Sequence, residues 1–367
     1  MVPAPSLLDK LAPRGFLPES DPRTHFDSGS PLAFLDNLGR DLPSLLEDPG
    51  FRPYVQALDI PRWPDETLRP ETLPELRLYY VRLGFLASAY VNQVSQARAT
   101  LLPRNIAVPL CHACRLLGRP PILSYDGYAL YNWKRFHADG PIALGNIDTI
   151  QNFVHLYDEH WFILVHVEIE GIAADILSAI AKVRHAGQDE ERINAALKEI
   201  SRAIWRQVAV LARIPEKMDP ALYYKKFRPY IRFFETVVYE GVADVPIHHR
   251  GETGAQSSIM PTLIAFMKID HKPSKLMDHL ADMRNFMPAE HRALIEEVAA
   301  LPSIKPLAAK DAFNEVLEAM ATFREVHYRW AQEYIHKWVD DPRGTGGTPY
   351  MKWLKQLIDE TRGHKIA

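Results

Sequence analysis

The sequence contains little cysteine, no long apolar run and no excess of charge of one sign. Two cysteines in 367 residues exclude a disulfide scaffold and are typical of a reducing compartment. No uncharged apolar stretch approaches the roughly 20 residues of a membrane span, and the N-terminus lacks the basic and apolar segments of a signal peptide. Lysine and arginine (43) balance aspartate and glutamate (46), so no overall positive field attracts nucleic acid. We expect a soluble, cytoplasmic protein that binds small molecules rather than nucleic acid or membrane.

The two cysteines, Cys111 and Cys114, lie in the stretch C-H-A-C. Covalent haem attachment requires a histidine directly after the second cysteine, where this chain has Arg115. A structural zinc site needs four ligands, and no second cysteine pair exists. A redox pair normally opens a helix after a strand, whereas this stretch is expected to lie in a short amphipathic helix after Pro109. We therefore predict two reduced, buried thiols without a chemical role.

The pattern of apolar residues predicts a mostly α-helical chain. Proline and glycine interrupt the first seventy residues, which should form short helices and loops. Apolar residues then recur with a helical period in four stretches, at 71–102, 158–187, 189–214 and 308–340, and a last helix follows Thr348 and Pro349. No convincing strand pattern appears. Because single cores stop growing near 250–300 residues, we expect two domains, 1–150 and 151–367, since the helical pattern dominates beyond residue 150.

One histidine lies on an apolar helical stripe. Phe323, His327, Ala331 and Tyr334 recur at helical spacing. A histidine at such a position is commonly a hydrogen-bonded core residue. The alternative is an axial ligand to a buried cofactor, because neutral imidazole is the usual protein ligand of haem iron.

Two glycine-rich loops could contact a ligand. The first, 251–258 (GETGAQSS), precedes a helix and offers backbone N–H groups to an anion or a bound gas, or is an ordinary loop and cap. The second, 344–348 (GTGGT), lacks the lysine of a phosphate-binding loop, so a mobile lid is as compatible as nucleotide binding.

The stretch YYKKFRPY, 223–230, interleaves aromatic and basic residues. This composition is compatible with nucleic-acid binding, but the overall charge favours a solvated helix face. Arg228 precedes Pro229, which predicts a non-helical backbone there and a guanidinium free to grip a carboxylate in two places.

Taken together, these stretches resemble the indoleamine 2,3-dioxygenases, haem enzymes that insert O2 into the indole ring of tryptophan. The resemblance is carried, in chain order, by ILSYDGYALYNWKR, FILVHVEIEGIAA, FRPYIRFFETVVYEG, GAQSS, DMRNFMPAEHRALI, FREVHYRWAQEYI and GTGGTPYMKWLKQLI. It covers the last two-thirds of the chain well and the proline-rich N-terminal part loosely.

The resemblance implies haem b between a small N-terminal and a large helical C-terminal domain, with His327 as the iron ligand. It also implies L-tryptophan or a related indoleamine and O2 as substrates, an electron donor that reduces ferric haem, and a monomer. Arg228 matches the arginine that holds the substrate carboxylate, and Thr345 a loop threonine near the ammonium group. The other implied substrate-binding residues are Tyr125, Tyr128, Phe162, His166 and Tyr223, and the other haem-contacting residues are Thr253, Gly254, Ala255 and Arg324.

Three positions depart from the familiar mammalian pattern. His166 aligns near a position that is a small serine in the mammalian enzymes, and Ile264 stands where those enzymes have an acidic residue. Tyr223 adds a hydroxyl to an edge of the pocket that is usually without one. His166 either bonds a backbone carbonyl or Tyr125, or accepts a hydrogen bond from the indole N–H, as a distal histidine does in the related tryptophan 2,3-dioxygenases. Oxidation of another indole, haem binding without turnover and a cofactor-free helical scaffold remain alternative functions.

Overall fold

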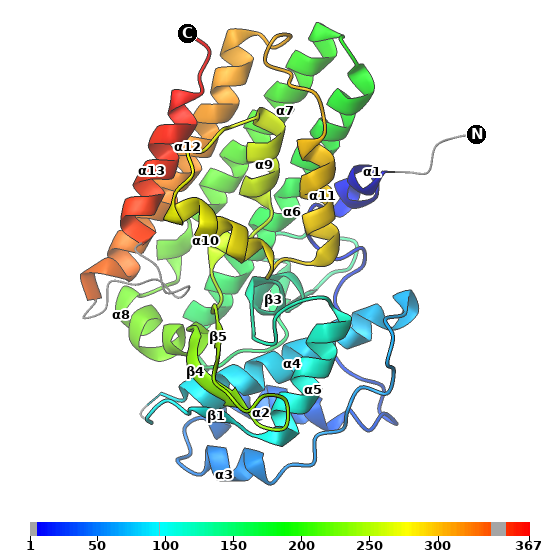
Figure 1. Ribbon diagram of the computed structural model, residues 1–367, viewed down its shortest axis with the longest axis vertical. Coiled ribbons are helices and arrows are strands. Elements are labelled where there is room, and N and C mark those ends of the chain that lie inside the picture. The colour runs from blue at the N-terminus through cyan, green and yellow to red at the C-terminus, as the bar shows by residue number, and fades with distance from the viewer. Residues whose placement is uncertain (1–5, 95, 339–349) are drawn as a thin grey trace.

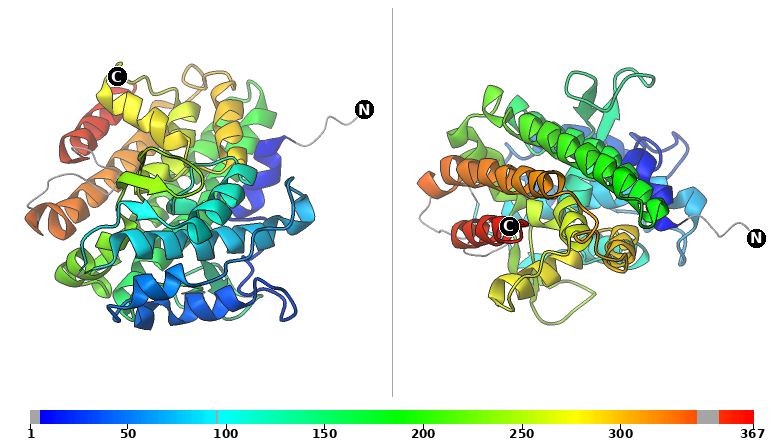
Figure 2. Two further views of the ribbon diagram at one scale, coloured as in Figure 1. Left: turned by 60° about the horizontal axis from the view of Figure 1, so that its bottom comes forward. Right: turned by 90° about the horizontal axis from the view of Figure 1, so that it is seen from above.

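The computed structural model describes residues 6–94, 96–338 and 350–367. The fold is mostly α-helical, as predicted (Figure 1). Long helices stand side by side in its upper part, where α6 packs on α7, α7 on α12 and α12 on α13, as Figure 2 also shows from above. The helices are α1 (Leu7–Leu11), α2 (Phe34–Leu45), α3 (Phe51–Gln56), α4 (Leu73–Asn92), α5 (Arg104–Leu116), α6 (Tyr157–Ala186), α7 (Glu190–Leu211), α8 (Pro220–Leu222), α9 (Ile259–Met267), α10 (Lys275–Arg284), α11 (Ala289–Ala299), α12 (Lys310–Tyr334) and α13 (Tyr350–Gly363).

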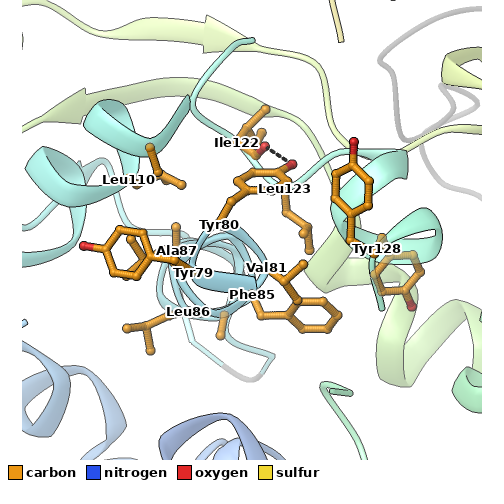
Figure 3. Packing of buried hydrophobic residues seen from close by; sticks show 14 of the residues in the cluster. Tyr79, Tyr80, Val81, Phe85, Leu86, Ala87, Leu110, Ile122, Leu123 and Tyr128 are labelled. Carbon is orange, nitrogen blue, oxygen red and sulfur yellow. Dashed lines mark hydrogen bonds between the residues drawn. The ribbon is translucent and has the colours of Figure 1, made fainter. Parts of the chain in front are cut away.

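The long helices form and end for local reasons. Asp189 accepts a hydrogen bond from the backbone N–H of Arg192 and so caps the start of α7. Gly187 adopts φ 62° and ends α6 where a side chain would be strained. Figure 3 shows α4 end-on, with apolar side chains on every side of it, which is why this helix is buried along its length. None of the helices described is both long and apolar enough to cross a membrane.

Helix α5 carries both cysteines as free thiols. Cys114 is buried and Cys111 half-buried, and burial raises the pKa of each thiol to about 12. The predicted burial is confirmed for Cys114 and is wrong for Cys111, although the raised pKa of both thiols disfavours the reactive thiolate. The helix begins at Arg104, however, so Pro109 lies inside it rather than before it.

Two small sheets were not predicted. Strand β4 (Phe234–Tyr239) pairs in parallel with β1 (Leu101–Leu102) and antiparallel with β5 (Ile247–His249), while β2 (Trp133–Arg135) and β3 (Ile147–Thr149) form a hairpin. These strands are too short for a clear alternation, and β1 and β4 are brought together from distant parts of the chain. Since Phe234 faces His249 in the register, the segments before β4 and after β5 emerge side by side.

Two hydrophobic clusters fill the molecule. One is built mainly from residues before 165, joined by the segment around β4, and the other mainly from the long C-terminal helices, joined by α1. Helix α6 contributes to both, and Phe162 packs against both. The boundary at residue 150 stays a prediction.

Candidate functional site

His327 on α12 and His166 on α6 are half-buried and lie within electrostatic range of each other. Burial lowers the pKa of His327 to about 4, and His166 lowers it further. Burial also lowers the pKa of His166. Both imidazoles are therefore neutral near pH 7, the form that binds a metal ion or accepts a hydrogen bond.

Neither ring nitrogen of His327 forms a hydrogen bond within the part of the chain that the structure describes. Buried polar groups are nearly always hydrogen-bonded, and His327 is a half-buried side chain on a helix flanked by buried residues. The described part of the chain thus offers His327 no hydrogen-bonding partner, and its role as an iron ligand stays a prediction. A neutral imidazole with an unused nitrogen fits the chemistry of an axial haem ligand.

His166 makes one hydrogen bond, to its own helix. Its Nδ1 lies 2.7 Å from the carbonyl oxygen of Phe162. Because a carbonyl only accepts, Nδ1 carries the proton and Nε2 is left as an acceptor. A backbone carbonyl was one of the partners expected for His166, and a role of Nε2 toward the indole stays a prediction. Tyr125 is not a hydrogen-bond partner; its ring packs edge-on, with centroids 5.9 Å apart.

Phe162 lies at the centre of a group of aromatic rings. Its centroid is 4.6 Å from the His166 ring, 5.5 Å from Tyr223, 6.0 Å from Phe227 and 6.3 Å from Tyr128. Three residues predicted for the site, Tyr128, His166 and Tyr223, therefore surround Phe162, which was also predicted. Phe227 was missed, although it follows Tyr223 by four residues and so shares its helical face.

The hydroxyls of Tyr125 and Tyr128 bind two buried glutamates on α6. Tyr125 donates to Glu170 at 2.8 Å and Tyr128 to Glu159 at 3.1 Å. Burial raises the pKa of each carboxyl to about 7. Figure 3 and the ring distances place Tyr128 beside Phe85, in the core around α4. The sequence analysis missed both glutamates. A charged residue within an otherwise apolar helix was the pattern that could have identified them.

The loop 251–257 is tied to the same residues. Gln256 accepts from the backbone N–H of Tyr125 at 3.0 Å and donates to the Gly251 carbonyl at 2.9 Å. Ser257 donates to Glu170 at 2.6 Å. The small residues expected against haem, Thr253 and Ala255, are half-buried and Gly254, between them, is exposed. The GAQSS motif therefore holds this loop against the tyrosine segment and α6.

The structure corrects the prediction for the backbone of Arg228. Arg228 is right-handed helical (φ −51°, ψ −37°), and its N–H donates to the Tyr223 carbonyl, which closes the π-helix Tyr223–Phe227. Pro229 takes the first turn of the 3-10 helix Arg228–Ile231, where a missing N–H costs nothing. The guanidinium is buried, with its carbon 5.2 Å from the centroid of Tyr224.

Two further residues named in the sequence analysis, Arg324 and Ile264, contact other parts of the C-terminal region. Arg324 is buried and donates to the Leu357 carbonyl at 2.9 Å and to the Thr361 hydroxyl, both on α13. Ile264 is half-buried against the C-terminal cluster. Thr345, and the whole stretch 344–348, lie outside the described residues.

Comparison with known proteins shows which family the chain is similar to. The family model described as indoleamine 2,3-dioxygenase matches residues 11–338. Rat indoleamine 2,3-dioxygenase 1 is 30% identical over 360 residues, covering 89% of this chain and 87% of that protein. Indoleamine 2,3-dioxygenase of Saccharomyces cerevisiae is 27% identical over 413 residues, covering 95% and 90%. A protein of Haliotis madaka named myoglobin is 26% identical over 352 residues, covering 89% and 90%. The chain therefore belongs to the indoleamine 2,3-dioxygenase family of haem enzymes.

Proposed function

We propose that the protein is a haem-dependent dioxygenase that inserts both atoms of O2 across the C2=C3 bond of the L-tryptophan indole and yields N-formylkynurenine. The observation that carries the proposal is His327, a neutral, half-buried imidazole without a hydrogen bond to any described residue. It lies within electrostatic range of a second neutral imidazole, His166, which packs against Phe162 in a group of aromatic rings. Haem b, when bound, supplies the redox-active iron at which O2 is activated.

The side chains would bind and orient the substrate. Phe162, Tyr223 and Phe227 offer ring faces against which an indole packs. Arg228 is the guanidinium for the substrate carboxylate, because a two-pronged contact fixes orientation as well as position. Thr345 is proposed to approach the ammonium group.

His166 is proposed to accept a hydrogen bond from the indole N–H. Its Nδ1 proton is already donated to Phe162, so its neutral ring presents Nε2 as an acceptor. The hydroxyls of Tyr125 and Tyr128 are committed to Glu170 and Glu159, so these residues contribute ring surface. No residue is needed as a general acid or base.

Haem is proposed to lie between the N-terminal domain, 1–150, and the C-terminal domain, 151–367. Ala255 packs against the first hydrophobic cluster, Ile264 against the second and Phe162 against both, which supports a site at their boundary. Thr253, Gly254, Ala255 and Arg324 are proposed haem contacts. We further propose a cytoplasmic monomer of tryptophan catabolism by the kynurenine pathway that needs an electron donor to reduce ferric haem.

A non-catalytic haem protein is the second candidate, because one of the similar proteins is named myoglobin. One experiment distinguishes the dioxygenase from the non-catalytic haem protein. The haem-loaded, reduced protein is given O2 and L-tryptophan, and the products are identified by mass spectrometry. N-formylkynurenine formed over many turnovers supports the dioxygenase. A stable oxygen adduct without product supports the carrier, and product only from another indole identifies a different substrate.

A further inference from the structure

Glu252 is a buried acid that has no role in the proposed dioxygenase reaction. It precedes Thr253 in the loop 251–257, is only 4% exposed, and burial alone raises the pKa of its carboxyl to about 8. No residue in the described ranges forms a hydrogen bond with that carboxyl group. This contrasts with Glu159 and Glu170, whose oxygens accept hydrogen bonds from the protein.

The position of the carboxyl follows from the two tyrosines. Glu159 and Glu170 are eleven residues apart on α6, about three turns or 16 Å along the axis. Tyr128 donates to the first and Tyr125 to the second. Burial raises the pKa of both phenols well above the usual value, and the charge of Glu252 acts on both. The Glu252 carboxyl therefore lies within electrostatic range of both tyrosine hydroxyls, which are held against α6.

Glu252 and Arg228 project from two segments that are held together. The backbone N–H of Glu252 donates to the carbonyl oxygen of Ile231 at 3.1 Å, and Ile231 ends the 3-10 helix that Arg228 begins. Gly251 packs so closely on this segment that a Cβ there would lie 2.4 Å from the Ile231 carbonyl oxygen. The pairing of Phe234 with His249 keeps the two segments side by side.

We propose that Glu252 receives the α-ammonium group of the substrate and makes the site selective for zwitterionic indoles over indole acids. The inference rests on the proposed function, and Arg228 remains the partner of the carboxylate. A buried ammonium group without a counter-charge is strongly disfavoured. An approaching cation favours the ionised carboxylate, so the neutral Glu252 carboxyl loses its proton to solvent as the ammonium group binds.

Calorimetry measures this proton directly. The ferric haem-loaded protein is titrated at pH 7 with L-tryptophan, and separately with indole-3-propionate, in two buffers of different ionisation enthalpy. We expect release of close to one proton per tryptophan and none per indole-3-propionate. No difference between the two ligands, or no binding of tryptophan, would overturn the proposal.

The variant Glu252→Gln keeps the size of the side chain and removes its charge. It should abolish proton release and weaken tryptophan binding by roughly tenfold or more, the size of a charge-assisted contact, while indole-3-propionate binding stays within about twofold. The matched control is Glu159→Gln, a second buried glutamate that already has partners, which should keep both proton release and the preference for tryptophan. An unchanged ratio of the two affinities in Glu252→Gln overturns the proposal. Proton release and amine preference without N-formylkynurenine formation would instead refute the proposed function alone.

Discussion

The Nδ1 atom of His166 lies 2.7 Å from the carbonyl oxygen of Phe162, one turn earlier on α6. This bond assigns the proton to Nδ1 and leaves Nε2 unprotonated. The Phe162 carbonyl is sufficient to orient the imidazole ring of His166. The Nε2 atom of His166 is therefore available to accept a hydrogen bond from a ligand.

If Nε2 accepts the indole N–H, 1-methyltryptophan should be a much poorer substrate than tryptophan. His166→Ser should lower activity with tryptophan and narrow the gap between the two substrates. Steady-state kcat/KM for both substrates, in parent and variant, measures the effect. An unchanged ratio would return His166 to a purely structural role.

The same role of His166 predicts that activity with tryptophan falls at acidic pH. Burial lowers the pKa of His166 below its usual value, so the imidazole stays neutral at pH 7 and protonates only below about pH 6.5. Protonation removes the acceptor, and activity should fall in that range. The activity of His166→Ser, measured over the same pH range, should not show this fall.

His327→Ala should abolish stable haem incorporation, because it removes the imidazole that we propose as the iron ligand. The matched control is His336→Ala. Helix α12 ends at Tyr334, and His336 is exposed on the 3-10 helix His336–Trp338, so this variant should retain haem. The Soret absorbance of the purified proteins reports the result. A full Soret band in His327→Ala would refute the assignment.

Arg228→Ala should leave haem binding intact and lower kcat/KM for tryptophan at least tenfold, since a charge-assisted contact contributes roughly 1.5–3 kcal/mol. Arg228→Lys should restore only part of the loss, because an ammonium group cannot reproduce the two-pronged grip. Tryptamine lacks the carboxylate and should be a poor substrate. Equal turnover of tryptamine and tryptophan by the parent protein would contradict this role.

Glu170 should make the protein less stable as the pH rises. Burial raises its pKa in the folded state to about 7, above the usual 4.5, so the folded state holds the proton more tightly than the unfolded state does. Stability from this group is full below pH 4.5 and is lost as the pH passes 7. Between pH 6.5 and 8, the free energy of unfolding should fall by about 1 kcal/mol more in the parent than in Glu170→Gln. Urea unfolding at both pH values measures the difference, and parallel behaviour of the two proteins would show that Glu170 does not change charge in this range.

Local pattern was sufficient for the long helices. The nearly all-apolar stretch that closes at Gly187 predicted α6, and the helical spacing of Phe323, His327 and Ala331 predicted α12. These features depend on residues a few positions apart, so they are visible in the sequence. The prediction for Arg228 failed because a local preference of the residue before proline was outweighed by the π-helix hydrogen bond to Tyr223.

Contacts between distant segments were decided only by the tertiary structure. Strand β4 exists through its pairing with β1, 130 or more residues earlier, and Glu170 is held by Tyr125 and Ser257 from two other parts of the chain. Glu252 is an ordinary loop glutamate in the sequence and becomes a buried neutral acid only when the loop packs on the segment ending at Ile231. Burial and charge depend on everything that surrounds a group in space, whereas helical periodicity depends on neighbours along the chain.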